Sequence, residues 1–309
     1  MLSIAYASNF GGISTIIGTP PNVAYVSFIS NKYGFDIPFL SWMLLCTPIA
    51  ILLLISLYIL LINLYPNNIK SSSEMSLIVK NELEKLGPMA IAEKRVLAIF
   101  ITTALLWISR DFINQLGIVK LDDNMIAVFG AVLMFLIPSG NSMHKTERLL
   151  VWSDTTKMAW GILLLFGGGM ALAGGLEKSG LISSLGNWMS GFTNGSSLLL
   201  LIISIAVVSI MLSEVMSNVA QVIVFAPVVT GMASSLNLDP LLLGMPMTLA
   251  ASCASMLPMG TPPNAIVFSS GHIRLKEMLT TGFIMNLIAV ILIVVFTKYF
   301  MPLIISLNS

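Results

Sequence analysis

The sequence predicts an all-α polytopic membrane protein that contains a re-entrant hairpin and broken transmembrane helices. Its 309 residues are 56% hydrophobic and only 9% charged, whereas a soluble domain carries about 25% charged residues. Long stretches carry no charge, and the sequence GTPPN occurs twice, at Gly18–Asn22 and at Gly260–Asn264. Two adjacent prolines remove backbone donors and disfavour helix at the preceding residue, so each GTPPN is expected to interrupt a helix.

The membrane spans follow from the uncharged stretches, because a transmembrane helix needs about 20 mostly apolar residues. After the segment that the first GTPPN interrupts, Phe39–Leu64 is a clear span. Residues 65–95 are polar and of mixed charge, so they are expected to form a loop with room for an interfacial helix. Further spans are expected at Val96–Ile113, Met125–Ile137, Trp160–Leu176 and about Met278–Phe300.

The segment Leu198–Met232 is expected to be a re-entrant hairpin. Basic residues concentrate in 65–95, 139–158 and 272–276, and the positive-inside rule places these loops in the cytoplasm. The hairpin must then enter and leave on the outer side, with its tip at "SEVMSN". Such a tip lies at membrane depth, where irregular backbone is tolerated only against protein or a water-filled cavity.

The regions around the two GTPPN copies form an internal repeat. "MLSIAYASNFGGISTIIGTPPNVAYVSFIS" aligns with "GMPMTLAASCASMLPMGTPPNAIVFSSG", and one long span follows each copy. The loop charges give the two units opposite orientations, which makes the repeat inverted. An inverted repeat with broken helices in corresponding places is the sequence pattern typical of a secondary transporter and of its binding site.

This repeat predicts the domain organisation. Residues 1–64 are expected to end the first repeat and 65–95 to be a cytoplasmic linker. Residues 96–192 are expected to hold scaffold-type spans, and 193–309 the hairpin, broken helix and last span of the second repeat. The first-repeat counterpart of the hairpin falls upstream of Met1, so we expect the sequence to be N-terminally incomplete.

Three motifs, "SEVMSNVA", "MLPMGTPPNAIVFSSG" and "WGILLLFGGGMALA", resemble the divalent anion/sodium symporter family of sodium–dicarboxylate and sodium–sulfate cotransporters. The resemblance extends along essentially the whole chain. It implies sodium-coupled symport of a divalent anion, with a C4-dicarboxylate such as succinate as the leading substrate. It also implies an elevator mechanism, a homodimer and a multi-pass location in the inner or plasma membrane. Neither enzymatic activity nor a nucleic-acid partner is expected.

The resemblance also implies the site residues. Those of the second sodium site are Ser213, Met216 (through its carbonyl), Ser217, Asn218 and Gly260, while Gly18 is a corner of the first sodium site. Those that contact the substrate are Ser217, Asn218, Thr19, Pro20, Thr261 and Pro262. Helix N-termini and short hydroxyl or amide side chains suit an anion, and carbonyls freed at a helix break suit sodium.

One residue departs from the family pattern, because the third residue of the hairpin tip is usually Thr and here is Val219. This departure keeps open a sulfate, other oxyanion or citrate carrier or exchanger of the same superfamily. An inactive fragment of such a transporter is also kept open, because the expected N-terminal incompleteness removes half of the first sodium site. A channel would need a continuous polar pore, and the motifs of an intramembrane enzyme, paired Asp, Ser–His or HExxH, were not found in the sequence.

Three further residues stand out within the apolar stretches. Glu214 is either a direct ligand or a structural hydrogen-bonding group, since an ionisable residue inside a membrane segment is a functional candidate. Cys46 and Cys253 lack CxxC spacing and are expected to be small buried hydrophobes.

Overall fold

The computed structural model describes residues 1–66, 73–117, 120–140, 147–157 and 198–301, with scattered positions between 160 and 184. The described residues form helices, with one isolated antiparallel bridge between Pro138 and Arg148. The chain divides into two compact units, one of Met1–Pro66 with Gly161–Ser309 and the other of Asn67–Trp160.

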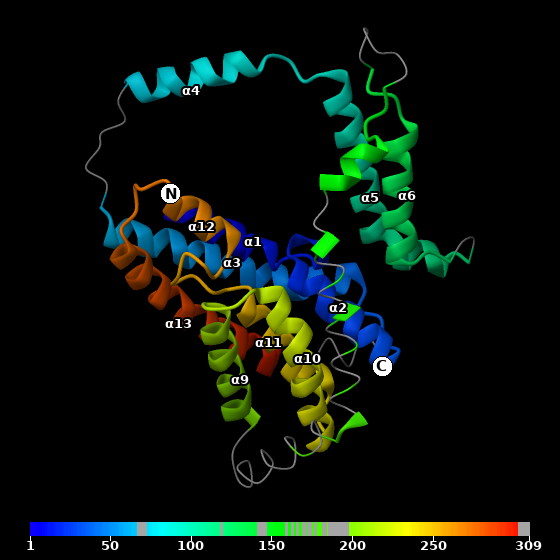
Figure 1. Ribbon diagram of the computed structural model, residues 1–309, viewed down its shortest axis with the longest axis vertical. Coiled ribbons are helices and arrows are strands. Elements are labelled where there is room, and N and C mark those ends of the chain that lie inside the picture. The colour runs from blue at the N-terminus through cyan, green and yellow to red at the C-terminus, as the bar shows by residue number, and fades with distance from the viewer. Residues whose placement is uncertain are drawn as a thin grey trace. The chain divides into compact units, whose positions relative to one another are not determined.

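The first unit contains the helices of both predicted repeats (Figure 1). In chain order these are α1 (Leu2–Gly12), the short 3-10 helix η1 (Ile16–Gly18), α2 (Pro20–Tyr33), α3 (Phe39–Leu64), α9 (Leu198–Ser213), α10 (Asn218–Ser235), α11 (Pro240–Ala251), α12 (Pro262–Ser269) and α13 (Leu275–Tyr299). Three of them, α3, α10 and α13, are long and apolar enough to cross a membrane. The all-α membrane class is therefore confirmed.

Both GTPPN copies interrupt a helix, as predicted. The first break lies between Gly12 and Pro20, and the second between Ala251 and Pro262. In each copy the first proline opens the following helix, where its missing N–H has no helical partner to lose. A long helix follows each broken pair, α3 after the first and α13 after the second. Their opposite orientation in a membrane stays a prediction.

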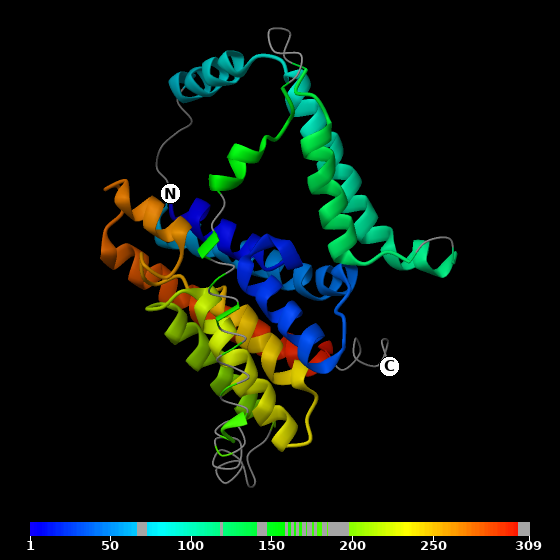
Figure 2. The same ribbon diagram turned by 45° about the vertical axis from the view of Figure 1, so that its right-hand side comes forward.

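The two helices of the predicted hairpin are present as α9 and α10, joined by residues 214–217, while their re-entrant course in a membrane stays a prediction. Both helices pack against α11, and the three lie side by side in Figure 2. The Ser209 hydroxyl donates to the Met247 carbonyl at 2.7 Å, and the Ser213 hydroxyl donates to the Ala251 carbonyl one helical turn later. Two hydroxyls on one face of α9 thus donate to carbonyls of α11. Small polar residues commonly join helices in apolar surroundings in this way.

The second unit contains α4 (Ser73–Leu86), α5 (Ile91–Gln115), α6 (Asp123–Leu136) and η2 (Trp152–Lys157). Helices α5 and α6 pack together, and Arg110 Nη1 lies 3.0 Å from Asp123 Oδ1. These helices correspond to the predicted spans Val96–Ile113 and Met125–Ile137. The predicted span Trp160–Leu176 lies largely outside the described residues.

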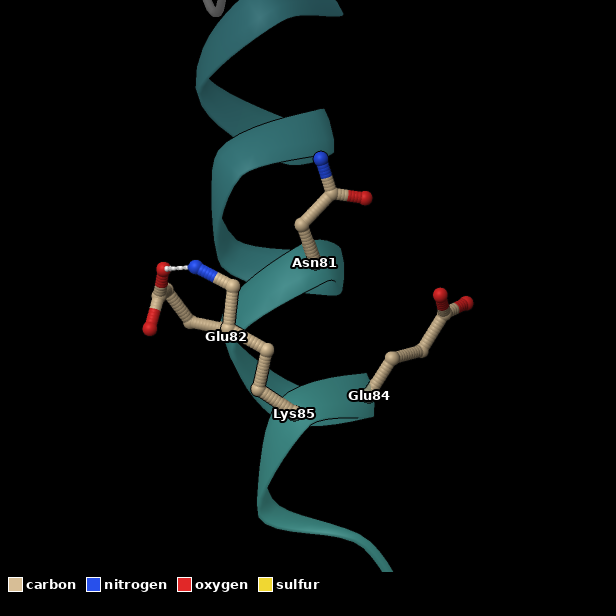
Figure 3. A pocket seen from close by; sticks show the side chains of 4 residues that line it. All are labelled: Asn81, Glu82, Glu84 and Lys85. Carbon is tan, nitrogen blue, oxygen red and sulfur yellow. Dashed lines mark hydrogen bonds and ion pairs between the residues drawn. The ribbon is translucent and has the colours of Figure 1, made fainter.

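Helix α4 shows that the 65–95 segment contains a regular element. Figure 3 shows its polar side chains, with Lys85 Nζ 2.6 Å from Glu82 Oε1. Both side chains are mostly exposed, and a surface pair of this kind contributes little to stability. All four residues drawn there come from one helix, so we assign them no binding role.

The first break depends on two glycines that approach each other closely. A Cβ added to Gly18 would overlap the Gly12 carbonyl oxygen, whereas a Cβ added to Gly11 would meet nothing within 4 Å. We therefore expect Gly18→Ala to lower the melting temperature of the detergent-solubilised protein by several degrees, since overpacking costs about 1–3 kcal/mol. Gly11→Ala is the matched control and should melt within a degree or two of the wild type. Equal melting temperatures for the two variants would contradict the close approach.

Candidate functional site

The hairpin tip and the second break bring several oxygen atoms together. Ser213 Oγ lies 2.5 Å from Asn218 Oδ1 and 2.5 Å from the Ala251 carbonyl oxygen. One hydroxyl has one proton, so it can donate to only one of these two acceptors at a time. Three oxygens that share a single proton form a group suited to a hard cation, which takes oxygen ligands.

Gly260 lies beside this group. A Cβ added to Gly260 would stand 3.4 Å from the Ser213 carbonyl oxygen and 3.3 Å from Glu214 Oε2. Ser213, Asn218 and Gly260 come from two different segments, and the structure brings all three together. Gly260 itself is buried, so its backbone faces protein at this point.

The remaining tip residues, Met216 and Ser217, lie in the 214–217 connection. Ser217 precedes α10 as its N-cap residue and makes no side-chain capping bond. Its hydroxyl has no hydrogen bond to any described residue, and the residue is exposed, whereas Met216 is half-buried. An exposed hydroxyl at a helix N-terminus is a donor available to an anion.

Glu214 is a buried carboxylate, 4% exposed, that accepts four hydrogen bonds. Its Oε1 accepts from the amides of Ser255 and Met256, each at 2.9 Å, and from Asn286 Nδ2 at 2.7 Å. Its Oε2 accepts from the Leu257 amide at 2.8 Å. Three successive amides of the second break thus form an anion nest, and Glu214 fills it.

This arrangement favours the structural role for Glu214. The side chain joins the hairpin tip to the second break and to α13, which carries Asn286. The same carboxylate adds negative charge beside Gly260, where a cation would gain from it.

The second break is organised around Thr261. The Thr261 hydroxyl oxygen accepts from Asn9 Nδ2 at 2.9 Å and from the Asn264 amide at 3.4 Å. Asn264 Nδ2 donates to the Leu257 carbonyl at 3.3 Å, and Asn264 Oδ1 accepts from Asn9 Nδ2 at 3.3 Å. Sequence reasoning missed Asn9, although an amide in the apolar stretch "AYASNFGG" was a visible signal.

The first break is closed by protein donors. Asn22 Nδ2 donates to the Thr15 carbonyl at 2.9 Å, and Trp42 Nε1 donates to the Ile13 carbonyl at 3.0 Å. Thr19 caps α2 without a side-chain bond and is half-buried.

The other predicted residues lie at the surface of the breaks. Gly18 and Pro20 at the first break are exposed, as is Pro262 at the start of α12. Among the described residues no hydrogen bond joins Gly18, Thr19 or Pro20 to the hairpin tip, so the second-repeat residues form the tighter group.

The charge pattern determines what this group can bind. Between residues 179 and 273 the sequence carries no Lys or Arg. An anion held by Ser217, Asn218 and Thr261 would therefore find hydroxyl, amide and helix N-terminal donors but no cationic side chain of this segment, so a bound cation would supply positive charge. The arrangement suits an anion and a cation that bind together.

Cys46 and Cys253 are free and buried, as the sequence predicted.

The sequence is similar to known transporters along its whole length. Residues 1–307 match the family described as "Sodium:sulfate symporter transmembrane region". The chain is also 38% identical to the protein named "Sodium-dependent dicarboxylate transporter SdcS" of Staphylococcus aureus strain USA300, over 311 aligned residues. The protein of the same name in strain MRSA252 matches equally, with 38% identity.

Each of these alignments covers 100% of this chain and 59% of the relative. The relatives are named as transporters and not as enzymes, and a protein of this family is a multi-pass integral membrane protein of the plasma membrane. The resemblance to the divalent anion/sodium symporters is confirmed, and the chain belongs to the sodium:sulfate symporter family.

Proposed function

We propose that the protein is a sodium-coupled symporter of a divalent anion, with a C4-dicarboxylate such as succinate as the leading substrate. The observation that carries this proposal is the group of oxygens at Ser213, Asn218 and Ala251 beside the free donor of Ser217. The relatives named as sodium-dependent dicarboxylate transporters match the whole of this chain, which supports the same substrate class.

In the proposed mechanism sodium binds before the anion. Its ligands would be the side-chain oxygens of Ser213, Ser217 and Asn218 with the carbonyls of Met216 and Gly260, while Gly18 would contribute to a first sodium site. Before sodium binds, the carboxylate of Glu214 repels a dianion. Bound sodium offsets this charge, so each ligand raises the affinity for the other, which is the reciprocal coupling that symport requires.

The dianion would then bind at the helix starts. Ser217, Asn218, Thr19 and Thr261 would donate to it, and Pro20 and Pro262 would shape the turns that place α2 and α12. The serine bonds between α9 and α11 and the bonds of Glu214 join the hairpin to the second broken helix. Such a connected body could move as one piece in an elevator mechanism, within a homodimer in the plasma membrane.

Uptake of radiolabelled succinate tests the proposal. The protein is expressed from its own genomic locus and reconstituted into proteoliposomes. We expect these proteoliposomes to accumulate succinate under an inward sodium gradient, and not under a potassium gradient. A sulfate arm is run in parallel, because the family description names sulfate. Sodium-independent exchange would contradict symport, and absence of uptake in both arms would contradict transport by this protein.

Val219 is expected to affect substrate choice. A Thr at this position would add a hydroxyl to the hairpin tip, and one hydrogen bond is worth about 1 kcal/mol. We expect Val219→Thr to lower the half-saturation concentration for succinate about fivefold. Competition by unlabelled succinate, sulfate and citrate measures the change. If sulfate is carried while succinate neither enters nor competes in either protein, the oxyanion alternative replaces the dicarboxylate assignment.

A further inference from the structure

We propose that Asn9 is a positioning residue that orients the Thr261 hydroxyl, so that the proton of this hydroxyl points to the bound dianion. This inference rests on the proposed function and deepens it. Asn9 belongs to α1 of the first repeat, whereas Thr261 caps α12 of the second. Helices α1 and α12 pack against each other, as Figure 1 shows.

The argument begins with the donors and acceptors of Thr261. A hydroxyl has one proton and two acceptor lone pairs. Asn9 Nδ2 and the Asn264 amide both donate to Thr261 Oγ1, at 2.9 and 3.4 Å. With both lone pairs occupied, the hydroxyl acts only as a donor. Thr261 is 5% exposed, so bulk water does not compete freely for this group.

The Asn9 side chain is itself fixed in place. Its Nδ2 also donates to Asn264 Oδ1 at 3.3 Å, and Asn264 Nδ2 in turn donates to the Leu257 carbonyl. One amide of the first repeat therefore holds two residues of the second GTPPN motif. A donor that is already oriented loses less entropy when a ligand binds, which is the advantage of preorganisation.

The two repeats differ at this position. Alignment of the GTPPN copies places Ala251 opposite Asn9, and an alanine side chain has no donor. Thr19 makes no side-chain capping bond either. Asn22 Oδ1 also lacks the partner that Asn264 Oδ1 has, among the described residues. Among the described residues, the Thr261 hydroxyl is oriented by an amide from the other repeat and the Thr19 hydroxyl is not, so we infer that Thr261 is the stricter of these two threonine donors.

A double-mutant uptake experiment tests the inference in the full protein in proteoliposomes. We expect Asn9→Ala to raise the half-saturation concentration for succinate about tenfold, because the Thr261 hydroxyl would no longer be held as a donor to the dianion and one hydrogen bond to a charged group would be lost. The maximal rate and the sodium dependence should change by less than about twofold, because Asn9 touches none of the proposed sodium ligands. In the Thr261→Val background, Asn9→Ala should cause no further increase.

Asn31→Ala is the matched control. Asn31 lies exposed on α2 and its amide donates to the Ser27 carbonyl of its own helix, so this variant should leave uptake unchanged. Asn9→Ser, a smaller change in polarity, is measured beside Asn9→Ala in case the alanine variant is poorly folded.

Three results would overturn the inference. One is an unchanged half-saturation concentration in Asn9→Ala, and another is an equal increase with and without the Thr261 hydroxyl. The third is a loss of protein, melting temperature and maximal rate together in both Asn9 variants, which would make Asn9 purely structural. Absence of sodium-dependent uptake by the wild type would instead overturn the proposed function, and the inference with it.

Discussion

Asn218→Ala should abolish sodium-dependent uptake while the protein stays in the membrane at the wild-type level. Asn218 Oδ1 belongs to the oxygen group with Ser213, and its amide begins α10. A hydrogen bond to a charged group is worth about 1.5–3 kcal/mol, so its loss lowers the affinity more than tenfold. The variant loses one contact to sodium and one to the anion. The two losses of affinity multiply, so the combined affinity for sodium and anion falls about a hundredfold or more.

Initial rates of succinate uptake over a series of sodium concentrations measure this effect. Asn31→Ala serves again as the control, because Asn31 is an exposed asparagine whose amide donates to the Ser27 carbonyl of its own helix. The amount of each variant in the membrane is compared by quantitative blotting. Wild-type uptake with unchanged sodium dependence in Asn218→Ala would remove Asn218 from the site.

Glu214→Ala should cause the largest loss of stability among substitutions at the hairpin tip. The carboxylate accepts from three backbone amides and from Asn286. The alanine variant leaves the Met256 and Leu257 amides and Asn286 Nδ2 without this acceptor, while the Ser255 amide keeps Asn286 Oδ1 at 3.1 Å. Each orphaned buried donor costs about 1–3 kcal/mol, so several together approach the 5–15 kcal/mol that is the whole stability of a typical protein. We expect poor accumulation of this variant and a melting temperature at least 10 °C below that of the wild type.

Two further variants separate the bonds of Glu214 from its charge. Glu82→Ala removes an exposed carboxylate that pairs with Lys85 on α4 and should leave the melting temperature unchanged. Glu214→Gln keeps the side-chain shape but directs an NH₂ group at amide donors, so its effect should lie between those of the other two. Full stability of Glu214→Ala would show that the second break holds its shape without this carboxylate.

Much of the fold could be predicted from the sequence, because the rules that determine its elements are local. Adjacent prolines end and restart a helix wherever they occur, so both GTPPN breaks were found at their observed positions. An uncharged stretch long enough to cross the membrane is visible without any knowledge of its neighbours, and α3 has the predicted bounds Phe39–Leu64. The resemblance to the divalent anion/sodium symporters also identified Ser213, Asn218 and Gly260 as candidates before their proximity was known.

Only the tertiary structure decided which of two roles Glu214 favours and what Asn9 contacts. The sequence shows that Glu214 is ionisable and lies in an apolar stretch, which is compatible with a ligand and with a structural group. The choice depends on three amides more than forty residues further along the chain. The periodicity of apolar residues in the sequence does not predict such long-range contacts. Asn9 lies still further from Thr261 in the sequence, and hydrogen bonds between distant segments form only when the packing of α1 against α12 places a donor and an acceptor within about 3 Å.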